Sequence, residues 1–183
     1  MRITTSFTLR EKVLDELETI SQQLNLSRSD IVRLAIEFGL NNDNSHNLNC
    51  LPKSFGYVKQ KSFIVDKGYV DRLYTKSKMR GESVSALVNL YLYSFLERID
   101  NVAWHLEKAI VGYNDKRTKV IVCLNHLEKN VGKFYRILTR KMKNRSFFFE
   151  IYRNEVADER YLVINTRHLR LIVKEFLEKI ATV

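Results

Sequence analysis

Residues 2–9 read RITTSFTL, a stretch in which apolar and polar side chains alternate. The odd-numbered positions include Ile3, Phe7 and Leu9, and the even-numbered positions carry a cation and small hydroxyl groups. Because the side chains of a strand point alternately to its two faces, this alternation predicts a strand with one apolar and one hydrogen-bonding face. The hydrogen-bonding face consists of Arg2, Thr4, Ser6 and Thr8.

Two helices are expected after this strand. Apolar residues recur at helical spacing over 11–24, and Asn25 suits the left-handed conformation that ends many helices. Ser27, with Asp30 three residues later, forms a capping box before a second apolar helix. Residues 1–40 therefore predict a strand-helix-helix unit.

The same pattern returns 56 residues further along the chain. At this one offset the strand, the helix stop and the helix cap coincide without a gap: Ser6–Leu9 with Ser62–Val65, Asn25 with Gly81, and Ser27 with Ser83. Such agreement indicates an internal repeat. The second unit is expected at 58–98, after an asparagine-rich linker at 41–57 that is long enough to let the two units pair within one chain.

Residues 99–183 predict a separate small domain. The helix that follows Ser83 is expected to continue as far as Ala109. The further elements are strands at 118–125, 146–153 and 160–167 and helices at 126–143 and 168–181. The chain is therefore expected to be an α+β protein, mostly helical, in which the repeated unit precedes a β-α-β-β-α domain.

A strand, a helix, a tight turn and a serine-capped second helix resemble the ribbon-helix-helix (MetJ/Arc-type) DNA-binding family. The resemblance covers residues 2–40 and 58–98, and the tandem layout resembles single-chain transcriptional regulators from archaeal viruses. Members of this family pair two strands antiparallel and insert the ribbon into the major groove of DNA. The resemblance implies a pseudo-dimer in which one chain supplies both strands.

The resemblance also assigns roles to residues. Outward strand residues would contact base edges: Arg2, Thr4, Ser6 and Thr8 in the first unit, and Gln60, Ser62 and Ile64 in the second. The first turn of each second helix would hold a phosphate: Ser27, Arg28 and Ser29 in the first unit, and Ser83, Val84 and Ser85 in the second. Free backbone N–H groups and the positive end of the helix dipole favour an anion at such a turn.

The second copy departs from the first at several positions. Lys59 and Lys61 are candidates for further DNA contacts, although the alternation turns Lys61 inward beside Phe63 unless the register shifts or the strand ends fray. Cations also replace two apolar residues: Lys76 stands where the first copy has Ile20, and Arg80 stands where it has Leu24. We therefore expect the second unit to be more open, or packed against the C-terminal part.

The charge of the chain favours a polyanionic partner, since 31 Lys and Arg against 21 Asp and Glu give a net charge of +10. Much of the excess lies in the C-terminal part. There Arg140, Lys141, Lys143 and Arg145 are candidates for phosphate contacts, with a solvated helix face as the alternative. The aromatic run Phe147–Phe149 is expected to pack in a core or in an oligomer formed through the C-terminal domain.

Several kinds of site are not expected. No apolar run reaches the ~20 residues that span a bilayer, so we expect no membrane partner. Two distant cysteines, Cys50 and Cys123, favour a reducing cytoplasm, that of the host for a viral protein. Cys123 and His126 lack the spacing of a four-ligand metal site, so neither a metal nor a cofactor is expected.

The expected function is a sequence-specific regulator of transcription that binds double-stranded DNA, and more specifically a repressor. No catalytic motif is visible, so we do not expect an enzyme. Two alternatives stay open. One is an antitoxin-type protein-interaction module, and the other is a nucleic-acid-processing enzyme with a ribbon-helix-helix front end.

Overall fold

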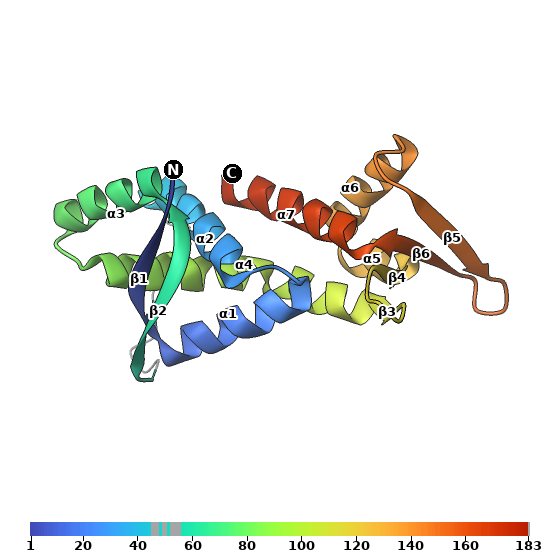
Figure 1. Ribbon diagram of the computed structural model, residues 1–183, viewed down its shortest axis with the longest axis horizontal. Helices are drawn as coiled ribbons and strands as arrows, with labels where there is room; N and C mark the ends of the chain where they lie inside the picture. The colour runs from blue at the N-terminus through green and yellow to red at the C-terminus, as the bar shows by residue number, and fades with distance from the viewer. Residues whose placement is uncertain (45–47, 49–50, 52–55, 183) are drawn as a thin grey trace. The chain divides into compact units, whose positions relative to one another are not determined.

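A computed structural model describes residues 1–182 apart from 45–47, 49–50 and 52–55. Much of the expected linker, together with Cys50, lies outside these described residues. The chain divides into unit 1, which comprises Met1–Asp100 and the residues from Leu177 on, and unit 2, which comprises Asn101–Phe176. Over the described ranges the fold is α+β and mostly helical, with two antiparallel sheets (Figure 1).

Unit 1 contains two copies of a strand followed by two helices, as the sequence predicts. The first copy consists of β1 (Arg2–Arg10), α1 (Glu11–Leu24) and α2 (Arg28–Asn42). The second copy consists of β2 (Val58–Asp66), α3 (Lys67–Arg80) and α4 (Val84–Ala109).

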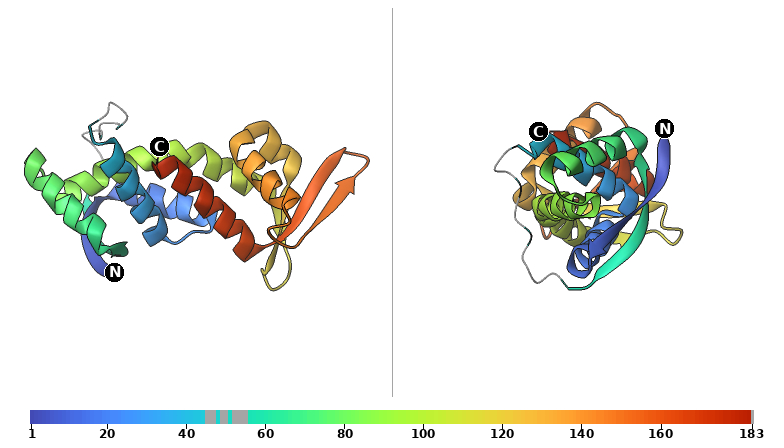
Figure 2. Two further views of the ribbon diagram at one scale, coloured as in Figure 1. Left: turned by 90° about the horizontal axis from the view of Figure 1, so that it is seen from above. Right: turned by 90° about the vertical axis from the view of Figure 1, so that its left-hand side faces the viewer.

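The strands β1 and β2 pair antiparallel and form a twisted two-stranded ribbon (Figures 1 and 2). Ser6 lies opposite Ser62 at the centre of the ribbon. Since these two serines are also equivalent in the repeat, a pseudo-twofold axis passes between them. Lys61 keeps the regular register, opposite Phe7, so the alternative of a shifted register is wrong.

The repeat of 56 residues is also present in the hydrogen bonds. Two bonds have counterparts whose donors lie 56 residues later. Glu11 N–H donates to the Tyr57 carbonyl over 2.7 Å, and Lys67 N–H donates over 3.0 Å to the carbonyl of Met1, the residue 56 positions before Tyr57. Leu26 N–H donates to the Ser21 carbonyl and Glu82 N–H to the Ser77 carbonyl, both over 3.1 Å. Asn25 and Gly81 end α1 and α3 in the left-handed conformation, with φ of 52° and 65°. Local sequence thus fixes the same turn twice.

The two copies share one core, because a single strand-helix-helix unit cannot bury its apolar faces alone. The rings of Phe7 and Phe63, equivalent in the repeat, stack across the ribbon with centroids 6.2 Å apart. Behind them lie buried apolar residues of both copies: Leu9, Val13, Leu17, Ile31, Leu34, Val65, Leu73, Leu87 and Val88.

Unit 2 is built on a four-stranded antiparallel sheet in the order β3-β4-β6-β5. Its elements are β3 (Ile110–Tyr113), β4 (Lys119–Cys123), α5 (Leu124–Asn130), α6 (Gly132–Lys143), β5 (Phe149–Asn154), β6 (Glu159–Asn165) and α7 (Thr166–Thr182), whose last turns belong to unit 1. The predicted hairpin and final helix are present.

The predicted β-α-β-β-α order is wrong in two respects. The short strand β3 precedes β4 and gains its conformation from pairing with β4 through an irregular register at Ile110 and Gly112. The predicted helix 126–143 is two helices, because Val131 leaves the helical region with φ −135° and ψ 58° while its side chain is buried. Among the described helices, none is long and apolar enough to cross a membrane.

Candidate functional site

The candidate site is the ribbon face that points away from the buried phenylalanines. Thr4, Ser6, Gln60 and Ser62 are exposed on this face, and Thr8 is half-buried. The large apolar residue Ile64 is half-exposed as well. The alternation read from the sequence therefore places all the proposed base-contacting side chains on one surface.

Pairing across the ribbon gives the two ends of this face different chemistry. At one end Thr4 lies opposite Ile64, and Arg2 forms an ion pair of 3.8 Å with Asp66. At the other end Thr8 lies opposite Gln60. At the centre the hydroxyl oxygens of Ser6 and Ser62 are 2.8 Å apart and share a hydrogen bond.

Arg10 belongs to the same face, although the sequence prediction ended the strand at Leu9. It is exposed at the end of β1, opposite Val58. The signal was the period of two itself, because position 10 continues the series of even-numbered outward residues.

The second helix of each copy begins beside an outer edge of the ribbon. The backbone N–H of Ile64 donates to Ser29 Oγ, and that of Thr8 donates to Ser85 Oγ, both over 3.0 Å. These two bonds are equivalent in the repeat, and each joins the helix of one copy to the strand of the other. The ribbon therefore has one helix start at each side.

Each helix start offers hydrogen-bond donors to an anion. Ser27 Oγ accepts from the N–H of Asp30, and Ser83 Oγ accepts from the N–H of Ala86, both over 3.0 Å. These bonds use the hydroxyl oxygens as acceptors, so each hydroxyl hydrogen can still donate. The N–H groups of the first two residues, Arg28–Ser29 in α2 and Val84–Ser85 in α4, have no acceptor within their own helices.

The two helix starts differ in their charged neighbours. Arg28 forms an ion pair of 3.1 Å with Glu18 of α1. Beside α4, Glu82 forms an ion pair of 3.0 Å with Arg80, which offsets the carboxylate that would repel a phosphate there. A cleft of about 670 Å³ adjoins this second start, and its polar lining includes Thr8, Arg10, Arg80, Ser83, Ser85 and Asn89.

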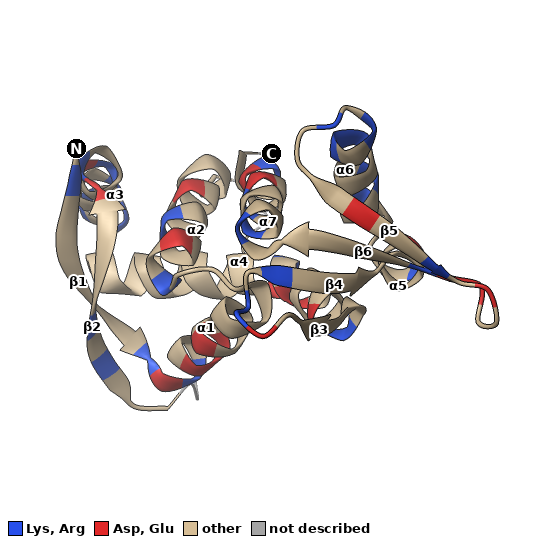
Figure 3. Cartoon of the chain, turned by 45° about the vertical axis from the view of Figure 1, so that its right-hand side comes forward, with Lys and Arg blue, Asp and Glu red and all other residues tan. Residues whose placement is uncertain are grey.

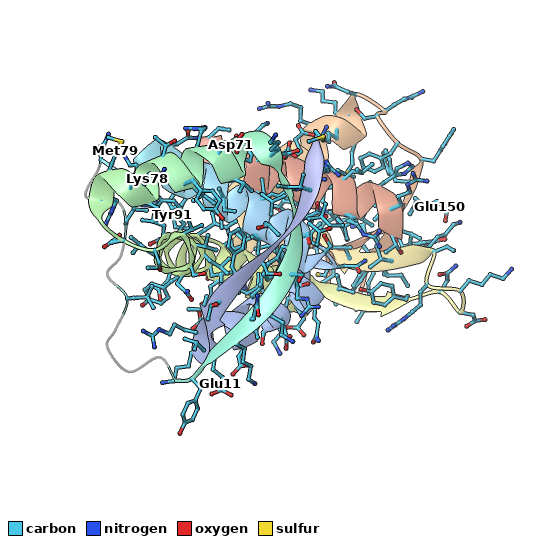
Figure 4. The ribbon with its side chains drawn as sticks, turned by 60° about the vertical axis from the view of Figure 1, so that its left-hand side comes forward. Glu11, Asp71, Lys78, Met79, Tyr91 and Glu150 are labelled. Carbon is cyan, nitrogen blue, oxygen red and sulfur yellow. The ribbon has the colours of Figure 1, made fainter. Side chains whose placement is uncertain are left out.

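Lys59 and Lys61 do not lie on the outward face. They alternate onto the face that carries Phe63, where Lys61 is half-buried. Lys59 Nζ lies 3.4 Å from Glu11 Oε1, at the ribbon end where β1 passes into α1 (Figure 4). The structure therefore separates both lysines from the proposed base-contacting residues.

The basic residues of the C-terminal part are divided between two positions. Lys133, Arg136, Arg140 and Lys143 are exposed at helical spacing along α6, and Arg145 is exposed just after it. Lys141 is turned to the flank, where its Nζ lies 2.7 Å from Glu175 Oε2 of α7. Figure 3 shows Lys and Arg concentrated on α6.

The remaining candidate ligands do not form a metal site. Cys123 is buried, and His126 Nε2 lies 3.2 Å from His105 Nδ1. Burial lowers the pKa of His126, and the neighbouring His105 and Lys129 lower it further. Among the described residues, no group of three or more His, Cys, Asp and Glu side chains could hold a metal ion.

Comparisons with known proteins add no relative. No protein-family model matches the chain, and no curated protein or solved structure gives a significant match.

Proposed function

We propose that this chain is a sequence-specific, double-stranded-DNA-binding regulator of transcription that acts as a single-chain ribbon-helix-helix pseudo-dimer. The outward face of the ribbon contacts base edges in the major groove, and the two helix starts hold the phosphates on either side. Occupation of an operator in this way is the basis of repression.

One observation carries this proposal. An exposed, hydrogen-bonding ribbon face has a helix start at each outer edge, joined by the equivalent bonds Ile64 N–H to Ser29 Oγ and Thr8 N–H to Ser85 Oγ. A major groove about 12 Å wide accepts a two-stranded ribbon, and its two phosphate backbones then lie beside that ribbon. In the proposed complex those backbones pass beside the two helix starts, whose N–H groups can bind phosphate oxygens.

The two ends of the ribbon favour different bases. Gln60 has an amide that can form a bidentate pair with adenine, whereas the methyl groups of Ile64 can only contact an apolar group such as the thymine methyl. Because these residues lie at opposite ends of the face, the operator should be an imperfect palindrome. Ser6 and Ser62 lie on the pseudo-twofold axis and face its centre.

Selection of binding sites from random duplexes tests the proposal. The wild type should enrich an imperfect palindrome, and Gln60→Ala should lose about 1–3 kcal/mol of discrimination at one base position in one half-site. Gln22→Ala, at an exposed glutamine of α1, is the matched control and should leave the selected site unchanged. Failure to enrich any sequence, or equal effects of both variants, would contradict the proposal.

The folded state of unit 2 supports a regulator over an antitoxin. An antitoxin of this family wraps its toxin with a segment that is unfolded when alone. In contrast, Asn101–Phe176 form a four-stranded sheet with helices, which is suited to self-association or to added contacts with the DNA backbone.

A further inference from the structure

The exposed edge of the sheet in unit 2 is unusually apolar. β5 is the last strand in the order β3-β4-β6-β5, so its outer edge has no neighbouring strand among the described residues. Phe148, just before β5, is 94% exposed, and Val156, just after it, is 99% exposed. The hairpin of β5 and β6 projects from the rest of unit 2 (Figures 1 and 2).

The helices of unit 2 bury side chains of β6 but leave most of those of β5 exposed. Leu162 of β6 is fully buried, but its neighbour on β5, Ile151, is 49% exposed. Tyr152 on the opposite face of β5 is exposed as well. A strand that exposes apolar side chains on both faces, beside unpaired backbone groups, is a template for another strand.

The opposite edge of the same sheet lacks these properties. β3 has four residues and an irregular register at Ile110 and Gly112. The guanidinium of Arg117 lies over the ring of Tyr113, 5.0 Å from its centroid. A short, irregular strand with a covering cation is a poor template, so the free pairing capacity of the sheet lies at β5.

We propose that β5 pairs antiparallel with β5 of a second copy of this chain, about a twofold axis at Ile151. A twofold axis normal to the sheet keeps each side chain on its own face, so Ile151 meets its own counterpart and Glu150 meets Tyr152 of the second copy. The register also sets the exposed Phe148 diagonal to Val156 of the second copy, within reach of a large side chain.

Charge complementarity favours this occupant. The turn after β5 carries Glu155 and Asp158, of which Asp158 forms an ion pair of 2.9 Å with Arg153. Lys143, the last residue of α6, and Arg145 precede β5, and Figure 3 shows the acidic turn and the basic helix α6. Antiparallel pairing brings the acidic turn of each copy beside the basic end of α6 in the other. Because the dimer is twofold symmetric, this attraction occurs twice. A partner that lacks either the acidic or the basic patch could not form both contacts.

Sedimentation of the full chain tests the pairing. The wild type should be a dimer, and Phe148→Lys with Val156→Lys should raise the dissociation constant at least about tenfold, because two charges then face the shared edge. Both positions are almost fully exposed, so the fold should be unaffected. Val111→Lys, at an exposed position of β3, is the matched control and should leave the dimer intact.

A charge exchange tests the register. Arg145→Glu and Glu155→Lys should each weaken the dimer, and the double variant should recover most of the lost affinity. A monomeric wild type, a dimer insensitive to the lysine pair, or single charge changes without rescue in the double variant would overturn the proposal. The inference does not depend on DNA binding by unit 1, since the readout is the mass of the protein alone.

Discussion

The two strand-helix-helix copies of unit 1 share a backbone pattern but differ in the chemistry that joins them. The copies meet in two contact regions, here called flanks, which the pseudo-twofold axis relates. In the first flank three positions are apolar and buried: Ile20, Leu24 and Ile99. In the second flank the residues equivalent to these, each 56 positions away, are charged: Lys76, Arg80 and Asp43, respectively. As expected of a more open second copy, α3 buries only Val70 and Leu73. Lys76 and Arg80 nevertheless bind a carboxylate at the end of α2.

Asp43 is the centre of that charged flank. Its side chain is only 3% exposed, and its oxygens lie 2.8 Å from Lys76 Nζ and 2.6 Å from Arg80 Nη1. Tyr91 Oη donates a further bond of 2.9 Å. Burial alone would raise the pKa of Asp43, but the bonds from Lys76 and Tyr91 and the charge of Arg80 outweigh it and lower the pKa.

Side-chain size is also exchanged between the flanks. In the second flank Tyr91 is fully buried against Gly39. In the first flank Ala35 is equivalent to Tyr91 and Phe95 is equivalent to Gly39, so the large and the small side chain change places. Both exchanges make the two copies complementary to each other but not to themselves. Two first copies would place Asp43 beside Ile20 and Leu24, leaving a buried charge without a partner, and two second copies would oppose Tyr91 and Phe95. This comparison explains how one chain favours pairing within itself.

The largest effect is expected at Gly39. A Cβ at this position would lie 1.9 Å from Tyr91 Cγ, so Gly39→Ala must displace a buried ring and should destabilise unit 1 by about 3 kcal/mol. Gly68→Ala is the control, since a Cβ there meets nothing within 4 Å and α3 should gain from a better helix former. Chemical unfolding of both variants measures the difference, and similar stabilities would show that size exchange does not hold the flanks together.

The next largest effect is expected at Asp43. Asp43→Ala leaves two cations beside the core and should cost about 2–3 kcal/mol. Asp43→Ile combined with Lys76→Ile and Arg80→Leu copies the apolar flank and should recover most of that loss. A triple variant less stable than Asp43→Ala would show that the flanks are not interchangeable.

The Asp43 network also has a defined dependence on pH. Because folding lowers its pKa, the folded state binds fewer protons than the unfolded state near that pKa, and stability rises with pH. The contribution is therefore complete above the ordinary value of 3.8 and is lost as pH falls through the lowered folded value. The stability difference between the wild type and Asp43→Asn should shrink in that acidic range.

The smallest effects are expected at the two equivalent serines. Ser29→Ala and Ser85→Ala each remove the acceptor of one strand N–H, so each should cost about 1 kcal/mol. Equal losses of unfolding free energy would show that the two equivalent bonds stabilise the protein to the same extent. Thermal unfolding can separate them, and a cost confined to one serine would mean that only one helix start is anchored to the ribbon.

The sequence predicted much of unit 1 and of its candidate site. The outward face of the ribbon, the helix stops at Asn25 and Gly81 and the caps at Ser27 and Ser83 all follow from local signals. It missed Arg10, where the strand is one residue longer, and β3, whose four residues include Gly112 and are too few to show a clear alternation. The break at Val131 was also missed, because apolar periodicity continues through it.

Local physics explains what the sequence by itself determined. Alternation, helical spacing and capping depend on residues within a few positions of one another, so the repeat and the elements of each copy can be read directly. The partner of Asp43, the size exchange at Gly39 and the unpaired edge at β5 join or expose residues far apart in the chain. Only the tertiary structure decides these features, because such contacts form when distant segments pack and leave no local pattern in the sequence.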